Sequence, residues 1–271
     1  QYYINSGPYS WVPSSIGSFG ANVNYKRYNF RSNLDMDITP TTTVSFGIQG
    51  NVSDNTEPAE GGSASIYRDI INAAPNAFPV ILKDGRLAGR DGLNNPYNML
   101  TQRGYVKNFS NALRANLSID QNLDFITKGL TAKITYAYDY GTNAADTRSR
   151  GINFFEPTGR DESGELLATE WNASSYQDYL SYSHASSSTR SQYAEATINY
   201  SRTFGKHDVG GLAMGFVKDY RYMIQGMDYI KSLPKRSLGL AGRVTYAYDK
   251  RYLLEANIGF NGSENFAKGN R

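Results

Sequence analysis

Polar and apolar side chains alternate along several long stretches of this chain. Residues 130–140 show the pattern clearly, with Ile134 and Tyr136 on one parity and Lys133 and Asp139 on the other. Because successive side chains of a β-strand point to opposite faces, such a stretch has one apolar and one polar face. The pattern recurs in about eight stretches, and their length matches the roughly nine to eleven residues of a tilted strand that crosses a bilayer. The alternation therefore predicts an all-β fold, an antiparallel transmembrane β-barrel segment of about eight strands.

The connections between the expected strands alternate in length. The strands are expected at about 22–38, 43–53, 105–120, 130–140, 189–204, 209–224, 236–248 and 252–260. Barrels of the outer membrane have short periplasmic turns and longer outer loops, which places the turns near 40, 125, 206 and 250 on the periplasmic side. Residues 1–21 are expected to form a loop. The two long connections span about 54–104, with a short helix near 64–73, and about 141–188.

The parity of the large apolar side chains predicts which residues meet lipid. In most strands these are the even-numbered residues, and in 209–224 the same parity carries Leu212, Met214 and Phe216. Lys107 and Lys218 are the basic exceptions in phase with them, and both lie toward strand ends. Tyrosine is enriched where a membrane meets water. The expected membrane girdle consists of Tyr28, Tyr105, Tyr138, Tyr140, Tyr220, Tyr222, Tyr246, Tyr248 and Tyr252.

Composition leaves this interpretation unchanged. Of the 271 residues, 39% are hydrophobic, and no apolar run approaches the roughly eighteen residues of a membrane helix. The net charge of +3 comes without a basic cluster, which argues against a nucleic-acid partner. The absence of cysteine excludes a disulfide scaffold and a cysteine-ligated metal. The chain opens at Gln1 without a signal peptide, and we expect it to be a piece of a longer protein.

Several segments are similar to one family of membrane proteins. They are residues 28–35 (YNFRSNLD), 123–130 (LDFITKGL), 243–252 (RVTYAYDKRY) and 261–267 (NGSENFA) followed by 268–271 (KGNR). These segments resemble the SusC/RagA-type TonB-dependent outer-membrane transporters of Bacteroidetes. The likeness extends over most of residues 22–271 and is weakest in the long loops. It is specific for the family and says nothing about the substrate.

The resemblance implies a bacterial outer-membrane barrel of about 22 strands with a plugged lumen. Such transporters import glycans, oligosaccharides or peptides, draw energy through TonB, and work with a SusD-like surface lipoprotein. They need no cofactor and are not enzymes. On this view residues 1–271 are a partial barrel domain, without the plug domain, the TonB-contacting segment and the C-terminal strands. We therefore expect an internal segment that alone neither transports nor inserts stably, since its edge strands lack partners.

Candidate chemistry is sparse. His184 and His207 lie 23 positions apart without the spacing of a metal site, and no nucleophile and base stand together, so neither a metal nor catalysis is expected. Aromatic faces hold sugars, and arginine orients polar ligands. The residues in the long loops that are expected to touch substrate are Tyr97, Asn95, Arg103 and Trp171.

Two alternatives stay open from the residues alone. A surface β-barrel receptor or adhesin would bind ligand with the same loops and would not transport it. A soluble β-sandwich also alternates, although its strands are shorter and its connections do not sort by length onto two ends.

Overall fold

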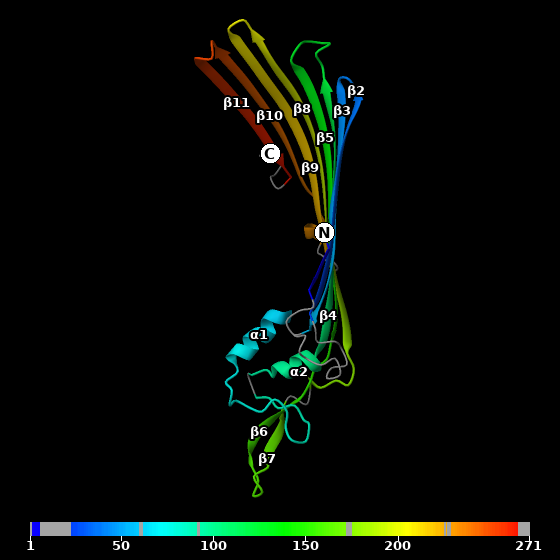
Figure 1. The fold of residues 1–271 in the computed structure, drawn as a ribbon, viewed down its shortest axis with the longest axis vertical. Helices are drawn as coiled ribbons and strands as arrows, with labels where there is room; N and C mark the ends of the chain where they lie inside the picture. The colour runs from blue at the N-terminus through cyan, green and yellow to red at the C-terminus, as the bar shows by residue number, and fades with distance from the viewer. Residues whose placement is uncertain are drawn as a thin grey trace. The chain divides into compact units, whose positions relative to one another are not determined.

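The computed structural model describes residues 2–5, 23–59, 62–90, 93–171, 175–224, 226 and 229–264. Among them, nine strands form one sheet in the order β1-β2-β3-β4-β5-β8-β9-β10-β11 (Figure 1). The long strands are β2 (Asn24–Thr39), β3 (Thr42–Pro58), β4 (Gly104–Asn122), β5 (Leu130–Ser149), β8 (Ser181–Phe204), β9 (His207–Ile224), β10 (Lys235–Tyr248) and β11 (Tyr252–Ser263). These eight strands confirm the expected fold class.

Two parts of the expectation were wrong. The short strand β1 (Tyr2–Asn5) pairs with β2 inside the segment expected to be a loop. The connection expected at 141–188 is largely strand: β5 continues to Ser149, β8 begins at Ser181, and a hairpin of β6 (Phe154–Arg160) and β7 (Leu166–Trp171) lies between them. Residues 265–271, which carry part of the family resemblance, lie outside the described residues.

Three helices interrupt the strands in the described part of the chain. The helix α1 (Gly62–Asn72) confirms the one expected near 64–73. It is followed by α2 (Pro96–Thr101), and α3 (Tyr229–Ser232) lies between β9 and β10. None of the helices within these residues is long and apolar enough to cross a membrane.

The short turns have the chemistry that tight hairpins need. Between β10 and β11, Asp249 and Lys250 have φ of 49° and 56°, and the Arg251 N–H donates to the Tyr248 carbonyl at 2.9 Å. Consecutive positive φ values match the right-handed twist of the flanking strands. Between β8 and β9, Gly205 has φ of 60°, which a residue without Cβ adopts at little cost.

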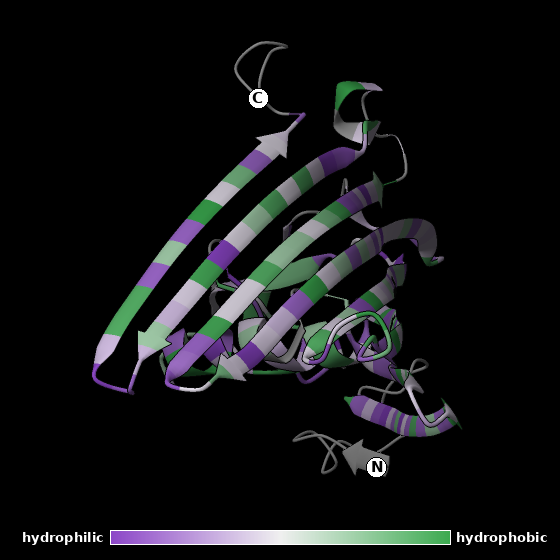
Figure 2. Ribbon diagram, turned by 90° about the horizontal axis from the view of Figure 1, so that it is seen from above, coloured by the Kyte–Doolittle hydropathy of each residue, from purple (hydrophilic) through white to green (hydrophobic). Residues whose placement is uncertain are grey.

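The chain forms two compact units. The first comprises residues 1–28, 52–110 and 143–186, and the second comprises 29–51, 111–142 and 187–271. Every buried apolar residue in the described part belongs to the first unit, where Ile66, Met99 and Leu100 form a small core with Val23. The second unit has no such core among its described residues, and many of its large apolar side chains are exposed. Hydrophobic and hydrophilic residues follow one another in bands along its strands (Figure 2). The apolar side of such a sheet needs an apolar environment other than a core of its own.

Candidate functional site

Strand pairing shows which side chains share a face of the sheet in the second unit. Leu240 of β10 lies opposite Phe260 of β11 and Gly215 of β9, and Ala196 of β8 lies opposite the same glycine. Residues directly opposed in an antiparallel pair point to the same side. One side therefore carries the even-numbered residues of β8, β10 and β11 and the odd-numbered residues of β9. We call this side the apolar face and the other side the polar face.

The apolar face is composed of large exposed hydrophobic residues. Its side chains include Ile198 (52% exposed), Val217 (58%), Leu240 (60%), Val244 (61%), Leu254 (69%) and Ile258 (78%). The polar face opposite carries Glu195, Thr197, Arg243, Thr245, Glu255 and Asn257. A continuous apolar surface of this extent, backed by polar side chains, is what a lipid-exposed strand array presents.

Strand β9 reverses the expected parity. Leu212, Met214 and Phe216 lie opposite Asn199, Thr197 and Glu195, and therefore belong to the polar face. The expectation that they meet lipid was wrong, because β9 carries apolar side chains on both parities and its neighbours decide its orientation. Phe216 stacks on Tyr193 across the polar face, with ring centroids 5.7 Å apart. The same register moves Lys218 to the polar face, opposite Tyr193 and Ser237.

The predicted girdle tyrosines lie on both faces of the sheet in the second unit. His207 lies on the apolar face, where its Nδ1 is 2.7 Å from the Tyr246 hydroxyl and its ring centroid is 5.0 Å from that of Tyr248. Rings that bury their faces and keep a polar tip suit a membrane–water boundary. Tyr220 and Tyr222, in contrast, are paired with Ser191 and Thr189 on the polar face, so their assignment to the lipid girdle was wrong. For the other girdle tyrosines the assignment stays a prediction.

The predicted substrate residue Asn95 has a structural role. It is fully buried and caps α2: its Oδ1 accepts the Tyr97 N–H at 3.1 Å. Its Nδ2 donates to the carbonyls of Val80 and Ala88 at 2.8 and 2.7 Å. Pro96 follows the cap, where a missing N–H costs nothing. Both polar atoms of the Asn95 side chain are therefore hydrogen-bonded within the loop and are not available to a ligand.

The other three predicted substrate residues occupy different elements. Tyr97 is half-buried at the start of α2, and half-buried Arg103 follows that helix, with its carbonyl accepting the Arg150 N–H at 3.1 Å. Trp171 is 37% exposed at the end of β7 and faces Phe154 with ring centroids 6.2 Å apart. Contact of Tyr97, Arg103 and Trp171 with substrate stays a prediction.

The β6–β7 hairpin is fastened to the loop that precedes α2. The Gly89 N–H donates to the Phe155 carbonyl at 3.2 Å, and the Phe155 N–H donates to the Leu87 carbonyl at 3.1 Å. The Arg86 guanidinium lies 4.4 Å from the centroid of the Phe155 ring, and Lys83 pairs with Glu165. Residues of both segments line a cavity of about 430 Å³. Backbone bonds of this kind give the hairpin a defined position on the loop.

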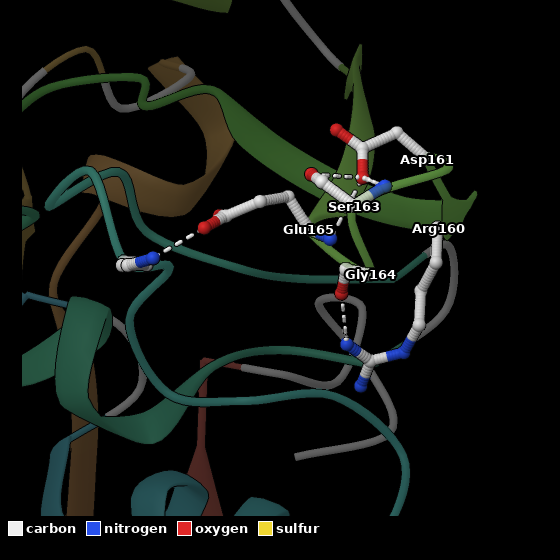
Figure 3. Close-up of polar contacts among 6 residues, drawn as sticks. Arg160, Asp161, Ser163, Gly164 and Glu165 are labelled. Carbon is white, nitrogen blue, oxygen red and sulfur yellow. Dashed lines mark hydrogen bonds and ion pairs between the residues drawn. The ribbon is translucent and has the colours of Figure 1, made fainter.

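The hairpin turn is organised around one carboxylate (Figure 3). Asp161 Oδ1 accepts the Ser163 hydroxyl at 2.7 Å and the N–H groups of Ser163 and Glu165 at 2.9 Å each. The Ser163 hydroxyl and these N–H groups lower the pKa of Asp161 below its ordinary value. In the loop before α2, the Arg86 N–H likewise lowers the pKa of Asp84. Both carboxylates are therefore ionised near neutral pH and hold their own turns. No cluster of three metal-ligating side chains occurs in the described part of the chain.

The sequence of the chain is similar to that of a known receptor. No protein-family model matches the chain. It is 23% identical over 305 residues to the TonB-dependent receptor P39 of Formosa agariphila, an alignment that covers 99% of this chain and 25% of that protein. The chain thus spans about a quarter of the length of this curated relative.

Solved structures of one transporter share the fold. A structure of the RagAB peptide transporter superposes with a TM-score of 0.63 at 17% identity and covers 93% of this chain and 29% of that one. Structures of the RagAB peptide importer in its closed-closed and open-open states give TM-scores of 0.60. The chain therefore has the fold of a β-barrel segment from this kind of protein, which confirms the resemblance. The relatives are named as a receptor and as transporters, in agreement with the expectation of a chain that is not an enzyme.

Proposed function

We propose that the chain forms part of the barrel of a TonB-dependent outer-membrane transporter. The observation that carries this proposal is the apolar face: across β8–β11 it presents exposed aliphatic and aromatic side chains, while the first unit holds the buried core. In lipid, exposed apolar side chains carry no free-energy penalty. The likeness to a TonB-dependent receptor over 99% of the chain supports the same reading.

The connections between strands support an orientation in the membrane. The connections have two or three residues between β2 and β3, β8 and β9, and β10 and β11, and seven between β4 and β5. The alternate connections contain α1, α2, the β6–β7 hairpin and α3. Because periplasmic turns are short and outer loops long, the helices and the hairpin belong to the extracellular side.

The extracellular segments are the proposed place of contact with substrate and with a SusD-like lipoprotein. We infer a peptide or oligosaccharide substrate, and the likeness to the RagAB peptide transporter favours the peptide class. Trp171 supplies a partly exposed aromatic face, and Tyr97 a half-buried one. Energy would come through TonB, by way of parts of the protein beyond this chain.

Growth and uptake test the proposal in the host organism. A strain without the complete gene is supplied with labelled peptides or labelled oligosaccharides, and uptake is measured with and without a protonophore. The proposal predicts that uptake of one class falls to background in the mutant and in protonophore-treated wild-type cells. Surface binding without energy-dependent uptake would instead favour the receptor alternative, and unchanged uptake of both classes would contradict the transporter assignment.

A further inference from the structure

A groove of about 500 Å³ crosses the apolar face of the second unit. Ala194 and Val217, paired directly with each other, form its small floor, and Tyr136, Leu238 and Phe260 form its walls. The Gln192 amide, which donates to the Tyr136 hydroxyl at 3.3 Å, places that tyrosine on the same side. A volume of this size suits a ligand of small-molecule dimensions, and its lining is mostly apolar.

Asp219, Arg236 and Glu264 line one end of the groove, and Arg190 and Arg221 lie beside this end on the paired strands β8 and β9. Asp219 accepts from Arg221 Nε at 3.2 Å and from Arg236 Nε at 2.9 Å, and Arg236 lies 3.6 Å from Glu264. Arg190 lies directly opposite Arg221 in the strand pairing. With three arginines and two carboxylates, the cluster has an excess of one positive charge.

The position of the cluster along the strand matches a membrane surface. Arg236 is twelve residues from Tyr248, which at about 3.3 Å per residue and a tilt of about 40° corresponds to roughly 30 Å along the membrane normal. The apolar band of an outer-membrane barrel is about 25 Å tall. With Tyr248 at the periplasmic boundary, Arg236 lies beyond the opposite boundary of the band, and the groove lies just inside it.

Two features of the arginines favour binding of an anion. Arg190 lies directly opposite Arg221, and the carboxylate beside Arg221, Asp219, also pairs with Arg236, so that one carboxylate serves two guanidinium groups next to a third. In addition, Arg190 Nε is shielded from solvent and has no hydrogen-bond partner among the described residues. A buried guanidinium donor without an acceptor costs free energy, which a phosphate oxygen would recover.

We propose that this groove is a binding site for a phosphorylated glycolipid of the outer leaflet, of the lipid A class. One acyl chain lies over Ala194 and Val217, and a phosphate lies against Arg190 and Arg221. The net positive charge favours an anionic headgroup, and the position beyond the apolar band places that headgroup in the extracellular leaflet. The inference rests on the proposed function in one respect, that the apolar face meets a bilayer.

Lipid retention by the intact protein tests this site. The protein expressed from its complete gene is delipidated in mild detergent and titrated with monophosphorylated lipid A while bound lipid is counted by native mass spectrometry. Replacing both arginines (R190Q/R221Q) is expected to weaken retention at least about tenfold, because hydrogen bonds to a charged group are lost. Lipid A from which the phosphate has been removed should bind the wild-type protein as weakly as the intact lipid binds the double variant.

Matched controls separate the site from general effects of charge and size. Arg202 lies on the same face of the same strand at its other end, so Arg202→Gln should leave retention unchanged. Ala194→Leu fills the floor of the groove and should weaken retention, whereas Ala196→Leu, two residues along on the same face, should not. Equal effects in site and control variants, or preferential retention of phosphatidylethanolamine or phosphatidylglycerol, would overturn the proposal.

The outcome is distinguishable from a failure of the proposed function. Assembly of each variant into the outer membrane is followed by its heat-modifiable mobility in gel electrophoresis. Loss of lipid A binding is expected with normal assembly. A normally assembled wild-type protein that binds no lipid A would refute the lipid site and leave the transporter assignment intact. A protein absent from the outer membrane would refute both.

Discussion

A charge placed at the middle of the apolar face should destabilise the protein strongly. Val244 is 61% exposed and lies opposite Gly211 and Ala256. It is four residues from Tyr248, which corresponds to about 10 Å above the periplasmic boundary of a band about 25 Å tall, close to its middle. Val244→Arg should therefore lower the free energy of unfolding by about 2–4 kcal/mol, the cost of a basic side chain at the bilayer midplane.

The neighbouring position provides the control. Thr245 points to the polar face, where it lies opposite Gly210 and Glu255. An arginine there meets water and a carboxylate, so Thr245→Arg should change the free energy of unfolding by less than about 1 kcal/mol. Both variants of the complete protein would be unfolded with guanidinium chloride in lipid vesicles. Equal costs at the two positions, or a larger cost for Thr245→Arg, would refute the assignment of the faces.

Three further predictions concern local structure. A Cβ at Gly239 would lie 2.2 Å from Phe216 Cε1, whereas one at Gly259 would meet nothing within 4 Å, so Gly239→Ala should cost about 1–3 kcal/mol of stability in the same assay and Gly259→Ala much less. Asn95→Ala leaves the carbonyls of Val80 and Ala88 and the Tyr97 N–H without their hydrogen-bond partner. Amide hydrogen exchange around α2 should become faster by the factor that corresponds to about 1–3 kcal/mol. Unchanged exchange would show that the cap is dispensable. The pKa of Asp161 is lower in the folded protein than in the unfolded chain. The stability that Asp161 gives to the hairpin turn is therefore complete above its unfolded-state pKa and is lost as the pH falls through its lowered folded-state pKa. A nitroxide at Glu162 should become mobile over that acidic range, and in Asp161→Ala, which lacks the acceptor oxygen, it should be mobile at every pH.

The long strands could be predicted from sequence because their alternation is strong and local. β10 and β11 carry their large apolar residues on the even-numbered positions, with Leu253 as the exception, and the structure pairs them accordingly. β9 could not be oriented in this way, because both of its parities are apolar. Leu212, Met214 and Phe216 lie on one side of the strand, and Val209, Ala213 and Val217, of comparable hydropathy, lie on the other. Its orientation follows from hydrogen bonding to β8 and β10, which no property of β9 alone reveals.

The loop residues show a second limit of sequence reasoning. The β6–β7 hairpin is short, contains Pro157 and Gly159, and has an irregular register between them, so it shows no period of two. Asn95 precedes a proline and a short helix, which is the signature of an N-cap, and that signal could have predicted its structural role. An asparagine in a long loop resembles a ligand contact until its hydrogen bonds are known.

The most direct test of the account is the environment of two adjacent side chains on β9. Nitroxide labels at Leu212 and at Ala213 are compared in the complete protein in lipid vesicles, with oxygen and a water-soluble nickel chelate as relaxation agents. The label at Ala213 should be accessible to oxygen and shielded from nickel, because the register places this residue on the apolar face. A lipid-exposed label at Leu212 together with a water-exposed label at Ala213 would contradict it.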